Sequence, residues 1–144
     1  MIHRKRVIRI QFSHMNELVM NCDVLVHEAT VGPILSDINR DYLDCSETEW
    51  KAIQNQIDND PELSEKWNRA ELRAPSIGHS TIKQAAQFAQ KVHAKKLCLV
   101  HIGGRYQAKS EGHKRAIREM MRFEAGRYFE GTVEVGEDGM ILNV

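Results

Sequence analysis

Two short apolar runs constrain the fold of this chain more than any other feature. They occupy residues 22–27 and 95–101, and each ends in a histidine, His27 and His101. Runs of this length between polar residues are typical of buried strands, whereas a membrane-spanning helix needs roughly 20 apolar residues. Open α/β sheets carry their chemistry at the carboxyl ends of such strands. We therefore expect an α/β fold with polar side chains gathered at one sheet edge.

Helical patterns surround these two strands. The segment Gly78-His-Ser-Thr81 opens the clearest one, because Ser80 or Thr81 can cap a helix whose apolar stripe continues to Val92. Further patterns predict a partly solvated strand over 4–12, a basic amphipathic helix over 109–127, and a hairpin from 132–135 and 140–144. This order of elements predicts a layered α/β half-sandwich.

Residues 31–77 differ from the rest of the chain. They are acidic, hold all three prolines and include Trp50 and Trp67. Helix starts are expected near Ser46 and at Asp60, where a capping residue precedes an acidic first turn. We interpret 31–77 as a helical arm inserted into one partial domain that spans 1–144. The arm either packs as a helical hairpin without a ligand or binds a partner through its tryptophans.

Composition limits the function classes. The 144 residues suit one domain or part of a larger protein, and 20 basic against 20 acidic side chains leave no general positive charge for nucleic acid. Three cysteines without a Cys-x-x-Cys pair are typical of a reducing compartment. We expect an intracellular protein of the cytoplasm or nucleus that does not engage a membrane. The basic residues among the first nine leave the mitochondrion as an alternative.

Four residues near the expected strand ends are candidates for chemistry. Glu28 follows the first strand, His79 stands at a helix start, and His101 ends the second strand. A neutral imidazole such as His101 can bind zinc, while His79 can act as a general acid beside the Glu28 carboxylate. Arg105, in the loop after His101, suits a phosphate oxyanion. For each residue alone a structural role is the alternative, but together they favour a hydrolytic site.

Three segments carry a more specific pattern. They are Cys22-Asp-Val-Leu-Val-His-Glu-Ala-Thr30, Gly78-His-Ser-Thr81 and Leu97-Cys-Leu-Val-His-Ile-Gly-Gly-Arg-Tyr106. In this order they resemble the carboxyl-terminal motifs of ribonuclease Z, the tRNA 3′ processing endonuclease family of the metallo-β-lactamase superfamily. The resemblance covers 16–109 except the arm, which is longer than the family pattern. It implies the carboxyl-terminal half of a metallo-β-lactamase-type αββα sandwich with a helical insertion.

The resemblance also implies roles and partners. His101 would be the last zinc ligand, and Glu28 with His79 would donate a proton to the leaving ribose oxygen. Arg105 would face a phosphate, and His27 would be mainly structural. The implied reaction is zinc-dependent hydrolysis of precursor tRNA at its 3′ side. Precursor tRNA, two zinc ions in the complete site and a second copy of the chain are the expected partners.

Two motifs of the complete family site do not occur in this sequence, namely His-x-His-x-Asp-His and the later Gly-Asp-Thr. We therefore expect that this chain alone does not hold a full zinc pair and is inactive without a missing amino-terminal half. Such a half-sandwich would expose an apolar face. Two alternatives stay open. One is another metallo-β-lactamase phosphodiesterase acting on a small phosphodiester, and the other is a non-catalytic interaction module.

Overall fold

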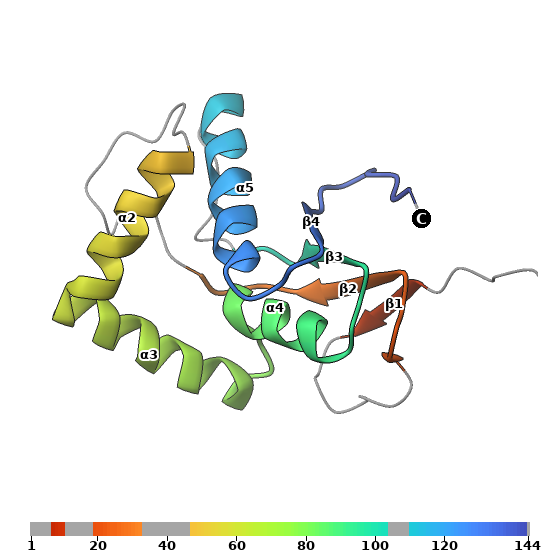
Figure 1. Ribbon diagram of the computed structural model, residues 1–144, viewed down its shortest axis with the longest axis horizontal. Coiled ribbons are helices and arrows are strands. Elements are labelled where there is room, and N and C mark those ends of the chain that lie inside the picture. The colour runs from red at the N-terminus through yellow and green to blue at the C-terminus, as the bar shows by residue number, and fades with distance from the viewer. Residues whose placement is uncertain (1–6, 11–18, 33–46, 104–109, 144) are drawn as a thin grey trace, which may run out of the picture.

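A four-stranded sheet forms the centre of the computed structural model, which describes residues 7–10, 19–32, 47–103 and 110–143. The strands lie in sequence order: β1 (Val7–Ile10), β2 (Val24–Glu28), β3 (Lys96–Val100) and β4 (Thr132–Val135). All neighbouring strands pair in parallel. The expected α/β class is confirmed, and the two short apolar runs are the central strands β2 and β3 (Figure 1).

The described helices are α2 (Glu47–Asn59), α3 (Pro61–Ser76), α4 (Ile82–Lys91) and α5 (Glu111–Gly126). Thr81 caps α4, because its hydroxyl accepts from the Gln84 N–H at 3.1 Å while the Gln84 side chain accepts from the Thr81 N–H at 3.0 Å. Asp60 caps α3 in front of a proline in the first turn. Both helix starts agree with the sequence. None of the described helices has the length and apolar character needed to cross a membrane.

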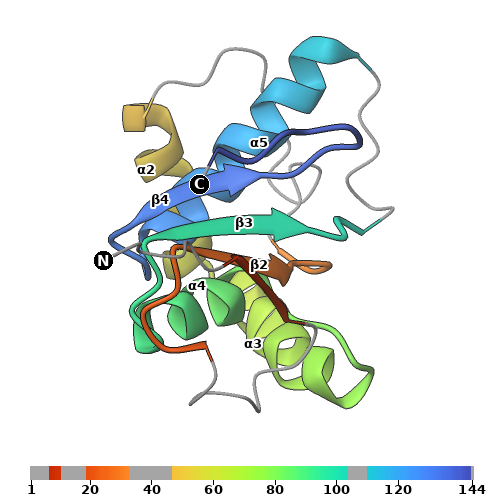
Figure 2. The ribbon, with the colours of Figure 1, turned by 90° about the vertical axis from the view of Figure 1, so that its right-hand side faces the viewer.

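The hydrophobic core lies between one face of the sheet and helices α4 and α5. Side chains alternate along a strand, so Leu25, Leu97 and Leu99 point to the same face, and all three are fully buried. The helices cover them with an apolar stripe (Ile82, Ala85, Ala86, Phe88, Ala89, Ile117, Met120 and Met121). Figure 2 shows the described helices behind the sheet, which is the one-sided layering of a half-sandwich.

The arm packs onto this core through α2 and α3. Ile57 of α2 belongs to the buried cluster. Arg127, just after α5, donates to the Asp58 carboxylate at 3.0 Å. On α3, Glu71 pairs with Lys83 of α4 at 2.9 Å. These contacts tie the described part of the arm, residues 47–76, to α4 and to the end of α5.

The expected carboxyl-terminal hairpin is wrong. The turn forms, since the Met140 N–H donates to the Glu137 carbonyl at 3.1 Å, but residues 140–143 make no strand. They approach the sheet face opposite α4 and α5 instead, where Lys96 Nζ donates to the Asn143 carbonyl at 2.9 Å. The run after the turn is apolar without alternation, and Ile141 stays 84% exposed. It therefore lacks the two-residue period that would bury one side of a hairpin strand.

Candidate active site

The carboxyl ends of β2 and β3 bring the first two candidate residues together. Glu28, the last residue of β2, pairs with Val100 at the end of β3, so His101 follows at the same sheet edge. The Ala29 N–H donates to the Val100 carbonyl at 2.9 Å and continues the pairing past the strand. His101 adopts a φ of 55°, and its Nδ1 atom lies 3.7 Å from Glu28 Oε2.

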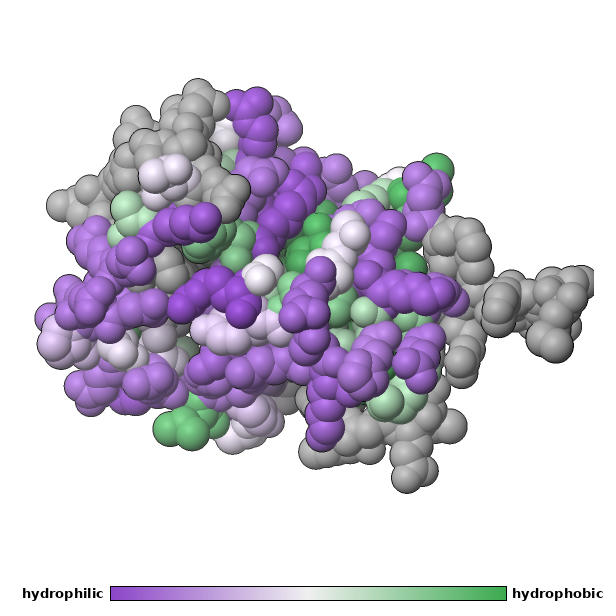
Figure 3. Space-filling model, in the orientation of Figure 1, coloured by the Kyte–Doolittle hydropathy of each residue, from purple (hydrophilic) through white to green (hydrophobic). Residues whose placement is uncertain are grey.

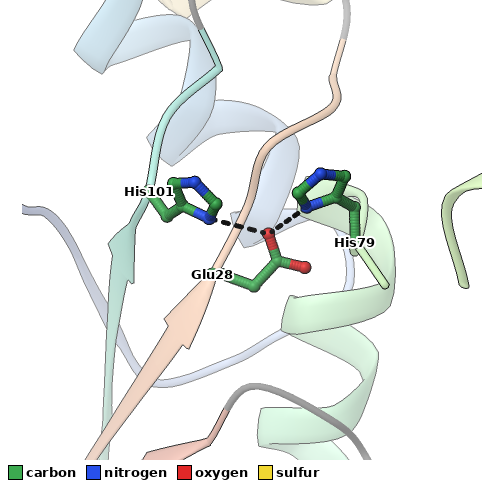
Figure 4. A group of neighbouring side chains, drawn as sticks. All are labelled: Glu28, His79 and His101. Carbon is green, nitrogen blue, oxygen red and sulfur yellow. Dashed lines mark ion pairs between the residues drawn. The ribbon is translucent and has the colours of Figure 1, made fainter. Parts of the chain in front are cut away.

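His79 reaches the same edge from the segment between α3 and α4. Val31, three residues after Glu28, forms an isolated parallel bridge with Thr81, which anchors this segment beside the end of β2. His79 Nδ1 then lies 3.6 Å from Glu28 Oε2. The rings of His79 and His101 have centroids 5.5 Å apart, one on each side of the carboxylate (Figure 4). The structure thus joins three residues that the sequence separates by 51 and 22 positions (79 − 28 and 101 − 79).

Glu28 is the buried member of this cluster. Its side chain is 4% exposed, whereas that of His79 is 32% and that of His101 is 57% exposed. Glu28 Oε1 is buried and has no hydrogen-bond partner within the described ranges. A buried carboxylate oxygen without a partner is costly. The other oxygen, Oε2, faces both imidazoles, at 3.6 Å from His79 Nδ1 and 3.7 Å from His101 Nδ1. Solvent reaches the cluster from the side of the two imidazoles.

Thr30 connects all three residues, although the sequence only placed it beside the strand end without giving it a role. Its hydroxyl donates to Glu28 Oε2 at 2.5 Å and lies 3.3 Å from His79 Nδ1. The same oxygen is 3.1 Å from the His101 carbonyl. A hydroxyl has one proton to donate, and the short contact assigns it to Glu28. The only sequence signal was its position in the His-Glu-Ala-Thr segment.

Thr30→Val should lower the free energy of unfolding by about 1–3 kcal/mol, because valine keeps the shape but leaves the buried Glu28 carboxylate without its hydroxyl donor. Thr30→Ser should keep most of the stability, since serine keeps the hydroxyl. The measurement is urea unfolding of the three proteins. Equal free energies of unfolding for the valine and serine variants would show that the hydroxyl does not hold Glu28.

Gly103 makes room for Thr30. A Cβ atom at position 103 would lie 2.5 Å from the Thr30 carbonyl oxygen and 3.3 Å from its methyl carbon. Only glycine, which has no Cβ atom, allows the two backbone segments to approach this closely. Arg105 and its neighbour Tyr106 lie outside the described residues, so the phosphate-facing assignment of Arg105 stays a prediction.

His27 lies on the helix-covered face of the sheet, away from the cluster. It is completely buried, its Nδ1–H donates to the Glu28 carbonyl at 2.8 Å, and its ring packs 5.7 Å from that of Phe88. Burial lowers the pKa of His27 below its usual range, and the hydrogen bond to the Glu28 carbonyl opposes this only in part. The geometry is that of a neutral core histidine, as the structural interpretation of His27 implies.

A pH-dependent stability follows from the buried His27. The folded chain resists protonation of this ring, but the unfolded chain takes up the proton near the ordinary histidine pKa of about 6.5. Folding should therefore weaken as the pH falls below that value, by at most about 1.4 kcal/mol per pH unit. His27→Phe should flatten this part of the profile in urea unfolding, whereas the exposed control His93→Asn should not. Identical profiles for wild type and His27→Phe would contradict the assignment.

The cluster has the chemistry of a metal site. Glu28, His79 and His101 each offer one ligand atom, and these atoms lie within 4.8 Å of one another. Two imidazole nitrogens and one carboxylate oxygen are a donor set that zinc and other transition metals accept. These three ligand atoms can hold one metal ion and leave part of its coordination shell open. A second ion would need ligands beyond those that the described part of the chain provides.

Comparison with solved structures defines the class of protein. The metallo-β-lactamase fold protein YhfI from Bacillus subtilis has a TM-score of 0.51 to this chain, covers 94% of it and is matched over 39% of its own length. Its sequence identity is 17%, so the likeness concerns the fold alone. The expected fold is confirmed: the chain forms part of a metallo-β-lactamase fold. Its Glu28 cluster offers ligand atoms that suit a metal ion.

Sequence comparison gives the family. The chain is 39% identical to ribonuclease Z of Archaeoglobus fulgidus over 128 residues and 31% identical to that of Bacillus velezensis over 125 residues. These matches cover 89% and 83% of this chain but 28% and 29% of the two relatives. No family model matches the chain. Over most of its own length the chain matches ribonuclease Z, and it spans less than a third of the length of these relatives.

Proposed function

We propose that this chain is the carboxyl-terminal portion of a zinc-dependent endonuclease that processes the 3′ side of precursor tRNA. The observation that carries the proposal is the convergence of Glu28, His79 and His101 at one sheet edge, in a chain whose relatives are named ribonuclease Z. The remaining metal ligands would come from an amino-terminal half. An intracellular homodimer of the complete enzyme belongs to the same proposal.

Each residue has one task in the proposed reaction. His101 would hold zinc, since its side chain is the most exposed of the three and directly follows β3. Zinc held there would lower the pKa of a water molecule and so supply the nucleophile. Arg105 is proposed to face the phosphate, where its guanidinium would offset the negative charge that develops on the oxygens.

The leaving group needs a proton, and the Glu28–His79 pair is proposed to provide it. The Glu28 carboxylate faces His79 Nδ1 at 3.6 Å and would hold the ring with this nitrogen toward it. The other ring nitrogen of His79 points away from the carboxylate (Figure 4). From there it would protonate the ribose 3′ oxygen as the bond between that oxygen and phosphorus breaks. The products would be a tRNA with a 3′-hydroxyl and a trailer with a 5′-phosphate.

Reconstitution tests this function directly. The 144-residue chain would be mixed with zinc, precursor tRNA and the part of the Archaeoglobus fulgidus relative that lies outside the matched region. We expect cleavage at the 3′ side by the mixture and none by either piece alone. A small phosphodiester added in excess should not compete. Competition by the small phosphodiester would favour the other metallo-β-lactamase phosphodiesterases, and an inactive mixture that has bound zinc and assembled would contradict the proposal.

A further inference from the structure

Three basic residues follow one another along α3 beside the candidate site. Lys66, Arg69 and Arg73, here called the basic strip, are spaced by three and four positions and so share one face of the helix. They line a groove of about 520 Å³, together with five other residues (Val31, Glu62, Ala70, Ala74 and Ile77). This volume falls in the range of ligand-binding clefts.

The groove lies next to the candidate site. Val31, in its wall, is adjacent to Thr30, whose hydroxyl bonds Glu28. At the other wall the Ala74 carbonyl accepts the His79 N–H at 2.9 Å. Arg73 directly precedes Ala74, so the basic strip runs toward His79. A strand lying in the groove would therefore pass from α3 to the cluster of Glu28, His79 and His101.

The guanidinium groups of Arg69 and Arg73 in the basic strip can reach a ligand. Arg69 pairs with Glu65 at 3.2 Å, but these side chains are 70% and 69% exposed. An exposed ion pair of this kind contributes little free energy, so Arg69 can leave Glu65 and bind another anion. Arg73 is exposed as well. Among the described residues that line the groove, Glu62 is the one acid, and it lies in the first turn of α3, at the end away from His79. The side of the arm that Figure 3 shows is mainly hydrophilic.

We propose that the basic strip binds the phosphate backbone of the RNA whose scissile bond enters the candidate site. The inference rests on the proposed function and extends it to the inserted arm. From Lys66 to Arg73 the helix rises about 10 Å, at 1.5 Å per residue. This length lets the strip neutralise two or three successive phosphates. The strip then positions the substrate, while Glu28, His79 and His101 act on it.

Binding by the 144-residue chain itself tests the inference without cleavage. The probe is a fluorescently labelled 3′-extended precursor tRNA, and the readout is anisotropy over a series of salt concentrations. The double variant Arg69→Gln/Arg73→Gln should bind at least about 10-fold more weakly at low salt. Its slope of log affinity against log salt should be shallower by about 1.4, because each lost contact to a single strand removes about 0.7. Arg69→Lys/Arg73→Lys should stay near the wild type.

The matched control is Lys91→Gln/Arg122→Gln, which removes the same charge from α4 and α5. Equal binding and equal slope for this control and the Arg69→Gln/Arg73→Gln variant would overturn the inference, as would wild-type chain that does not bind at low salt. Thermal unfolding of each variant separates a loss of binding from a loss of α3. In the reconstituted cleavage assay the strip variant should raise KM and leave kcat unchanged, whereas failure of the proposed function would remove cleavage from the wild-type mixture.

Discussion

His79→Ala should lower precursor tRNA cleavage by the reconstituted enzyme about 10²–10⁴-fold while zinc content stays unchanged. The size follows from the usual contribution of a general acid. The Glu28 carboxylate lies on one side of the His79 ring and solvent on the other, so the ring can hold a proton and release it toward a substrate. Alanine removes that proton without touching His101. The measurements are single-turnover rates and zinc content of the same preparation.

A leaving group that needs no proton provides the sharper version of this test. With a precursor tRNA in which sulfur replaces the leaving 3′ oxygen, the loss in His79→Ala should shrink to less than about 10-fold, because a thiolate leaves as a stable anion and needs no acid. His93→Asn is the matched control, since His93 is exposed, lies after α4 and tolerates asparagine at its φ of 53°. Unchanged turnover of precursor tRNA in His79→Ala would remove the acid role.

His101→Asn should abolish cleavage for a different reason, namely loss of the metal. We expect zinc affinity to fall by more than about 10-fold, since even side chains that merely support a ligand contribute 10- to 100-fold. Asparagine is the better replacement than alanine here. His101 has a φ of 55°, a conformation that asparagine adopts readily, so the backbone between β3 and Gly103 should survive.

The two variants form a crossed pair. His79→Ala should retain zinc and lose the rate, whereas His101→Asn should lose both, and added zinc should partly restore the rate of His101→Asn alone. Isothermal titration with zinc and the cleavage assay measure the two quantities independently. Full metal content in His101→Asn would remove His101 from the ligand set, and zinc loss in His79→Ala would move His79 into that set.

Local sequence patterns predicted the elements that position the site. β2 and β3 follow from short apolar runs, and α4 follows from the Thr81 cap with its apolar stripe. Such signals lie within a few residues of one another, so they can be recognised without knowing how the rest of the chain folds. The predicted carboxyl-terminal hairpin does not form, because a segment pairs with the edge of a sheet only where the sheet can bury one side of that segment. That choice is made by the whole sheet and not by the Gly-Glu-Asp-Gly turn.

The sequence by itself determined the class of elements, the family pattern, and the residue types Glu28, His79 and His101. Only the tertiary structure decided that they meet. Parallel pairing of β2 with β3 sets Glu28 beside His101, and the bridge from Val31 to Thr81 brings His79 in. The tertiary structure also brought Thr30 into contact with these residues and set the direction in which the basic strip runs. Contacts between distant segments depend on the packing of the whole core, whereas strands and helices are already favoured by neighbouring residues.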